Sequence, residues 1–207
     1  DAIGLIQTAE GAMTETHSML QRMKTLTTQA ANGTYTTTAR NNIQAEVDAL
    51  NKEITRIAST TKFNGETPLS PAKKGQNLTF FIGATADKTN AMTVGQLNMT
   101  AAALTIDKIK VDSTTNAFKA MASVDAAIEK VSTYRAALGA AQNRLEHTVN
   151  NLKVTSENIT SAESRIRDTD MADEITAYTK NNILLQAAQS MLSQSNAMPQ
   201  GVLSMLQ

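Results

Sequence analysis

The sequence predicts a mainly α-helical protein: an elongated antiparallel helical rod, similar to a coiled coil, with a small β-hairpin subdomain and a C-terminal helical tail. Two observations support this fold class. Apolar side chains recur every three or four residues over long stretches, and only 3% of the 207 residues are aromatic. Narrow seams between helices need only small aliphatic side chains, whereas a wide globular core needs larger ones.

Two helices are expected first, over residues 1–31 and 36–60. Asn32 and Gly33 signal the turn between them, so the pair should form an antiparallel hairpin. Each helix has apolar or small residues at alternating spacings of three and four, the pattern of one buried face. These residues are Ile6, Ala9, Met13, Thr16, Leu20, Met23, Thr27 and Ala30 in the first helix, and Ile43, Val47, Leu50, Ile54 and Ile57 in the second.

Residues 62–111 have a different character and predict a small β-hairpin subdomain. Asn64, Gly65, Pro68, Pro71 and Gly75 interrupt any helical pattern there. Short runs rich in β-forming residues lie at 78–82 and 92–94, with 106–111 as a possible third strand.

A third, long helix is expected over residues 117–166. It carries an unbroken aliphatic stripe at a strict period of seven, formed by Val124, Val131, Leu138, Leu145, Leu152, Ile159 and Ile166. Residues 1–167 are therefore interpreted as one rod-shaped core domain, and residues 168–207 as a separate C-terminal helical segment.

The C-terminal segment follows a charged joint at residues 165–170 and is strongly apolar, with an interruption expected near Pro199. It either packs on its own domain or is buried by another chain. The second interpretation is favoured, because the segment has little polar surface of its own. The apolar residues expected to make this contact are Ile175, Ile183, Leu184, Leu185, Met191, Leu192, Val202, Leu203 and Leu206.

The composition argues against several classes of function. Nineteen basic residues balance nineteen acidic ones, so no excess positive charge favours binding to nucleic acid or to acidic lipid. The absence of cysteine excludes thiolate metal sites and cysteine nucleophiles, and neither His17 nor His147 lies in a metal-binding pattern. No catalytic residue, metal site or cofactor is predicted, and no run of apolar residues is long enough to span a membrane. What remains is assembly into a polymer through repeated complementary faces.

Several segments, in this order and spacing, make the sequence similar to bacterial flagellin over essentially its whole length. The start of the first helix resembles the first core helix of that family, and residues 61–65 resemble its turn into the β-hairpin. Residues 138–145 and 162–168 resemble the signature of its long C-terminal core helix. The matching segments read IQTAEGA at 6–12, LQR at 20–22, TKFNG at 61–65, LGAAQNRL at 138–145, AESRIRD at 162–168, NNIL at 181–184 and QA at 186–187.

This resemblance implies a structural subunit that polymerises into the extracellular bacterial flagellar filament and serves motility. It further implies secretion without a cleaved signal, association with other flagellin subunits, and an export chaperone that binds the apolar C-terminal tail. The chain leaves no room for large variable outer domains, which implies a compact subunit. The family's N-terminal inner-core segment does not precede Asp1 in this sequence, so we expect the chain by itself not to build native filaments.

The resemblance also implies recognition by the innate receptor Toll-like receptor 5, through Gln21, Arg22, Leu26 and Glu46. Arg22 and Leu26 are four residues apart and so are neighbours on one helix face. Leu26 either is exposed beside Arg22 as an interface anchor or widens the apolar stripe of the core, and the sequence leaves both open.

A different function class remains as an alternative: a soluble or cell-surface ligand-binding protein built on the same scaffold. It needs a concave pocket, which only the irregular region 62–110 could supply. An enzyme on this scaffold is a third hypothesis, which the sequence disfavours because it contains no recognisable set of catalytic residues.

Overall fold

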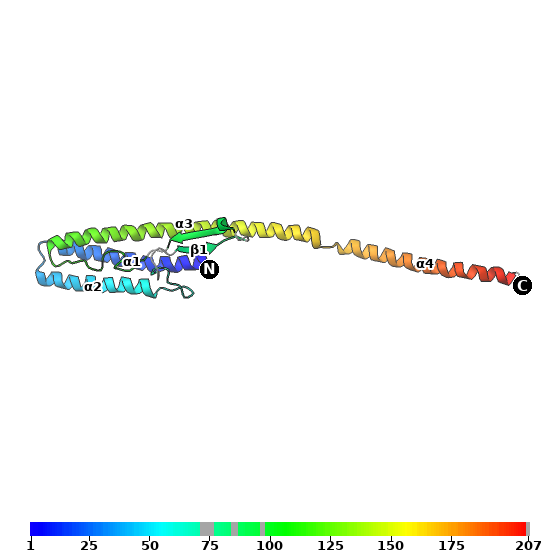
Figure 1. The fold of residues 1–207 in the computed structure, drawn as a ribbon, viewed down its shortest axis with the longest axis horizontal. Coiled ribbons are helices and arrows are strands. Elements are labelled where there is room, and N and C mark those ends of the chain that lie inside the picture. Colours follow the sequence, from blue (N-terminus) through cyan, green and yellow to red (C-terminus); the bar gives the residue numbers. More distant parts are fainter. Residues whose placement is uncertain (71–76, 84–86, 96–97, 206–207) are drawn as a thin grey trace. The chain divides into compact units, whose positions relative to one another are not determined.

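The computed structural model describes residues 1–70, 77–83, 87–95 and 98–205 (Figure 1). The chain divides into two compact units, residues 1–151 and 152–207. The helices in chain order are α1 (Ala2–Ala31), α2 (Thr37–Thr60), α3 (Thr114–Arg167) and α4 (Met171–Met205). A two-stranded sheet, β1 (Asn77–Phe81) and β2 (Ala91–Gly95), lies between α2 and α3 in sequence, with a short 3-10 helix η1 at Lys88–Asn90.

The first unit is built from α1, α2 and the first part of α3, which run side by side (Figure 1). All eight positions of the periodic stripe predicted in α1 are buried, together with Leu5 and Leu26. On α3 the stripe residues are buried from Val124 to Leu145, and small residues such as Ala120 and Ala127 occupy the alternate positions. Small side chains on one helix let the neighbouring helix approach closely, so this seam needs little aromatic volume. The predicted helical fold is confirmed.

Arg40 ties together the ends of three helices. Its guanidinium donates to the backbone carbonyls of Ala30 at 2.9 Å and Asn32 at 3.0 Å, and to the Thr114 hydroxyl at 3.2 Å. The carbonyls at a helix C-terminus have no partner within the helix, so a cation that donates to them stabilises that end. α2 itself begins at an N-cap, since the Thr36 side chain accepts the N–H of Ala39.

The predicted β-hairpin is present as the antiparallel pair β1 and β2, with Asn77 opposite Gly95 and Phe81 opposite Ala91. Its inner face carries Met92 and Val94, which are buried in the core. Before the hairpin, a tight turn at Asn64 and Gly65 uses positive φ angles of 50° and 87°, the left-handed region that these two residue types adopt most readily.

Residues 106–111 form no strand, so the possible third strand is wrong. The backbone of residues 101–111 is instead held along α2 by polar side chains spaced seven and four residues apart, and its apolar side chains fill the core. The bonds run from Gln44 Nε2 to the Ile109 carbonyl (3.2 Å), from the Val111 N–H to Gln44 Oε1 (2.8 Å), from Asn51 Nδ2 to the Ile106 carbonyl (2.8 Å), and from the Ala101 N–H to Thr55 Oγ1 (3.3 Å). Turns within the segment satisfy some of its backbone groups, such as the Ile106 N–H, which donates to the Ala101 carbonyl at 2.9 Å. A helix offers no ladder of free backbone groups, so side chains of α2 bind others.

The second unit holds the end of α3 and all of α4. A break at residues 168–170 separates the two helices, and α4 begins where Asp170 Oδ1 accepts the N–H of Ala172 at 2.8 Å. The helix runs on through Pro199 to Met205 rather than being interrupted there. A proline inside a helix removes one backbone donor and its ring crowds the carbonyl four residues earlier, so Pro199 makes this end of α4 less stable. The break lies inside the second unit, and the division of the chain at residue 167 stays a prediction.

Candidate functional site

Arg22 and Glu46 form the one direct pair among the four residues that the sequence associates with a receptor. The Arg22 Nε lies 2.8 Å from Glu46 Oε1 and joins the outer faces of α1 and α2. Their side chains remain 53% and 42% exposed. The hydrogen bond to Glu46, followed by its charge, raises the pKa of Arg22 further above its usual range. The pair therefore leaves charged donor and acceptor groups exposed to solvent.

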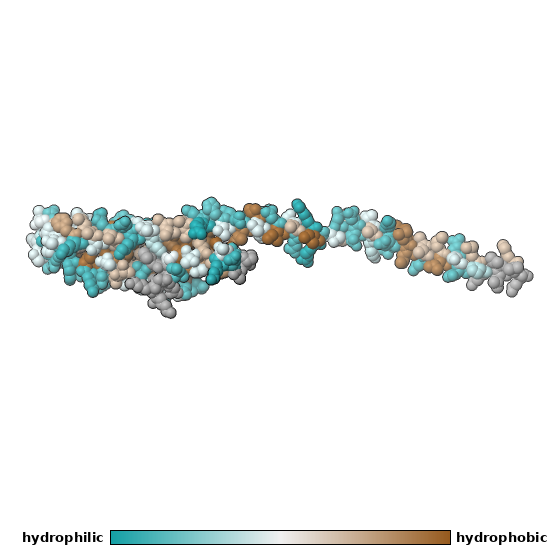
Figure 2. Space-filling view, turned by 45° about the horizontal axis from the view of Figure 1, so that its top comes forward, coloured by the Kyte–Doolittle hydropathy of each residue, from teal (hydrophilic) through white to brown (hydrophobic). Residues whose placement is uncertain are grey.

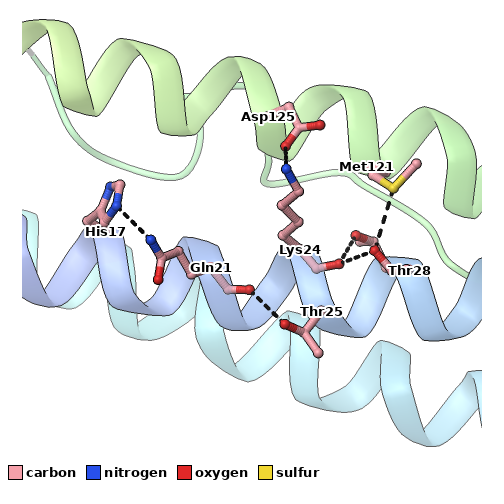
Figure 3. Close-up of polar contacts among 8 residues, drawn as sticks. His17, Gln21, Lys24, Thr25, Thr28, Met121 and Asp125 are labelled. Atoms are coloured by element: carbon pink, nitrogen blue, oxygen red, sulfur yellow. Dashed lines mark hydrogen bonds and ion pairs between the residues drawn. The ribbon is translucent and has the colours of Figure 1, made fainter.

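Gln21 lies beside this pair on α1, and its amide is 2.9 Å from the Nε2 atom of His17 (Figure 3). Leu26 is different, because it is 2% exposed and belongs to the hydrophobic core. Of the two readings left open by the sequence, the structure therefore selects the one in which Leu26 widens the core stripe. The reading of Leu26 as an exposed anchor is wrong for the isolated chain.

A second set of polar contacts holds α1 against α3 (Figure 3). Lys24 Nζ lies 2.8 Å from Asp125 Oδ1, and the Thr28 hydroxyl lies 3.6 Å from the Met121 sulfur. Both charged side chains are about half exposed, so the ion pair contributes at most about 1 kcal/mol. These contacts set the alignment of α1 and α3 more than their stability.

The second unit exposes an unusual amount of apolar surface, which appears as brown areas over the end of α3 and over α4 in Figure 2. Leu152, Ile159 and Ile166 continue the α3 stripe but are 42%, 63% and 85% exposed. The tail residues predicted to contact a partner are also exposed where their side chains are described: Ile175, Ile183, Leu184, Leu185, Met191 and Leu192. The side chains of Val202, Leu203 and Leu206 lie outside the described residues.

Among the residues that the structure describes, no three histidine or acidic side chains lie close enough together to hold a metal ion. None of the described helices combines the length and the apolar character that a membrane crossing requires. His17 contributes to the α1 surface, and His147 lies on an exposed face of α3.

The sequence reasoning missed the polar side chains on α2 that hold residues 101–111. Gln44 and Asn51 are seven residues apart and border the apolar stripe, and Asn51 is 7% exposed. A polar residue repeated at the heptad period beside a buried face is the signal that could have identified them.

Comparisons with known proteins agree with this architecture. The bacterial flagellin N-terminal helical region matches residues 1–74, and the bacterial flagellin C-terminal helical region matches residues 121–206. A flagellin of Bacillus subtilis is 45% identical over 100% of this chain and 78% of its own length. A 33 kDa flagellar filament core protein of Treponema phagedenis is 43% identical, over 100% and 76% respectively. The crystal structure of Bacillus cereus flagellin superposes with a TM-score of 0.64 and 30% identity, covering 78% of this chain and 92% of that one.

Proposed function

This chain belongs to the bacterial flagellin family, and we propose that its exposed surfaces make the contacts of a structural subunit of the flagellar filament. The filament is extracellular and drives motility, and its subunits associate with one another. The role is structural rather than enzymatic. It also replaces the alternative reading as a ligand-binding protein, which no specific observation favours.

The observation that carries the assembly proposal is the change in burial along α3. The stripe is covered as far as Leu145 and exposed from Leu152 onward, although its period of seven continues. This part of the stripe is exposed to water in its own chain, so its side chains contribute fully to stability only when another chain covers them. We propose that neighbouring subunits cover this stripe in the filament.

A matched pair of variants tests the assembly proposal. In the full-length protein that contains this chain, Ile159→Asp places a charge on the stripe, whereas Ser161→Asp places the same charge on another exposed face of the helix. We expect Ile159→Asp to prevent polymerisation in a sedimentation assay and Ser161→Asp to permit it. Equal polymerisation of the two variants contradicts the proposal.

We also propose that the α4 tail binds the flagellin export chaperone before secretion, through Ile175, Ile183, Leu184, Leu185, Met191, Leu192, Val202, Leu203 and Leu206. This proposal is supported by the exposure of Leu184 and Leu185, at 57% and 60%. Burying one leucine is worth about 1.5–3 kcal/mol, so Leu184→Ala should weaken the complex about tenfold. Calorimetric titration with the chaperone measures this, with the neighbouring Gln186→Ala as control. Equal affinities for both variants count against the tail as the binding segment.

The third proposal is recognition by Toll-like receptor 5 through Gln21, Arg22 and Glu46, with Leu26 supporting them from the core. The exposed ion pair at 2.8 Å supports a polar contact surface on α1 and α2. Arg22→Ala should lower the response of receptor reporter cells, whereas Lys52→Ala on another exposed part of α2 should not. Leu26→Ala should lower it through loss of stability, which thermal unfolding would reveal. Unchanged responses to both Arg22→Ala and Leu26→Ala remove this site from consideration.

A further inference from the structure

A cationic cleft of about 320 Å³ lies where α3 begins. Three of its lining residues are lysines, with Lys108 and Lys110 on the segment before the helix and Lys119 on the second turn of α3. All three are exposed, and within the described chain none of them is part of an ion pair. No described residue that lines the cleft is acidic.

One carboxylate, that of Asp112, lies close to the cleft without lining it. Asn116 does line the cleft, and its Nδ2 donates to Asp112 Oδ1 at 2.7 Å. This hydrogen bond, followed by backbone hydrogen bonds and last by the charge of Lys110, lowers the pKa of Asp112, which therefore stays ionised. The N-terminal end of α3 adds a partial positive charge of its own. Three lysines outnumber this one carboxylate, so the cleft keeps a net positive charge that favours an acidic partner.

A segment of matching chemistry follows the C-terminal end of the same helix. Residues 168–174 contain Asp168, Asp170, Asp173 and Glu174 and no basic residue, and all are exposed. Asp170 caps α4, and Asp173 and Glu174 lie in its first turn, where the helix dipole favours negative charge. This acidic segment presents several carboxylates on a short, ordered stretch of chain.

We propose that the acidic segment 168–174 of one copy of this chain docks into the lysine cleft of a second copy. The proposal rests on the role of the chain as a filament subunit. The two surfaces are different parts of the subunit, so the contact is heterologous: each copy donates one segment and receives another, and the contact repeats along a polymer. Complementary charges of this kind fix the register between partners and speed their association.

Charge reversal tests the contact in the full-length protein. Lys108→Glu, Lys110→Glu and Lys119→Glu together should slow the elongation of filament seeds at low salt by about tenfold or more. Reversing the segment with Asp168→Lys, Asp173→Lys and Glu174→Lys should slow it similarly, while Asp170 is kept as the helix cap. Combining both sets should restore elongation, because the charges are complementary again.

The control reverses the same number of exposed lysines elsewhere, with Lys52→Glu, Lys62→Glu and Lys130→Glu. Elongation close to the wild-type rate is expected. An unslowed cleft variant, or a combined variant that is not restored, overturns the contact alone. A wild-type protein that does not elongate seeds overturns the filament role and the contact together.

Cross-linking provides a second measurement that is independent of rates. The chain has no cysteine, so Lys119→Cys combined with Asp173→Cys introduces a single pair of thiols. Mild oxidation of assembled filaments should link different copies into covalent ladders, whereas Lys52→Cys with Asp173→Cys should not. Absence of ladders in filaments, or a disulfide formed within one chain in dilute monomer, overturns the proposal.

Discussion

Two single substitutions on the α3 stripe, Leu138→Ala and Leu152→Ala, should distinguish residues needed for folding from residues needed for assembly. Leu138 is 1% exposed and Leu152 is 42% exposed, although they lie two heptads apart on α3. In the monomer, Leu138→Ala leaves a cavity and should lower the free energy of unfolding by about 2–5 kcal/mol. For a chain of this size, this lowers the melting temperature by roughly 4–20 °C. Leu152→Ala should cost the monomer clearly less, about 1 kcal/mol, because this side chain is only partly covered by its own chain.

In the filament, Leu152→Ala should in addition weaken assembly, because Leu152 becomes covered there. The three carbon groups lost in this substitution are worth about 2.4 kcal/mol when fully buried. With 42% of the residue still to be covered, the loss on assembly is about 1 kcal/mol. The critical concentration for polymerisation should therefore rise about fivefold.

Two measurements check this pair of variants: thermal unfolding of the monomer followed by circular dichroism, and the critical concentration measured by sedimentation. Equal loss of monomer stability in both variants would refute the reasoning, because it requires Leu152 to be covered within its own chain. So would an unchanged critical concentration for Leu152→Ala, because the exposed stripe would then take no part in assembly.

Three further outcomes are expected. Asn51→Ala should cost about 1–3 kcal/mol in chemical denaturation, because it leaves a buried backbone carbonyl without its donor; a cost below about 0.5 kcal/mol contradicts the role assigned to this side chain. Gly83→Ala should cost about 1–3 kcal/mol and shift the NMR signals of the hairpin, because an added Cβ would lie 2.2 Å from the Cγ atom of Asn90; unchanged signals count against this close approach. Arg56→Ala should raise the pKa of Glu53, which the hydrogen bond from Arg56 holds below its ordinary value of 4.5. The stability that this pair contributes is fully present above pH 4.5 and is lost as the pH falls through the lowered pKa of Glu53. An NMR titration that finds the same Glu53 pKa in both proteins would contradict this pairing.

The helical part of the fold could be predicted because its information is local. The periodic residues of α1 are buried as a set, since a period of seven places them on one face whatever the helix packs against. The turn at Asn64 and Gly65 was equally readable, because left-handed backbone favours these residue types.

Residues 106–111 could not be assigned correctly, because the α2 side chains that bind their backbone lie 55 to 67 residues away in the sequence. Their alternating apolar residues resemble a strand, but their backbone bonds to Asn51 and Gln44 and within its own turns. Leu26 was ambiguous for a related reason. It lies off the ideal seam but is 2% exposed, and helical periodicity alone does not determine how wide the covered face is.

The sequence by itself determined the helices, their apolar faces and the family, since each depends on residue types at fixed spacings along one chain. Only the tertiary structure decided which of those faces are already covered. The α3 stripe reads the same before and after residue 151, but burial depends on neighbours that are distant in sequence. The same holds for the lysine cleft, whose members come together only when the segment before α3 folds back beside its first turns.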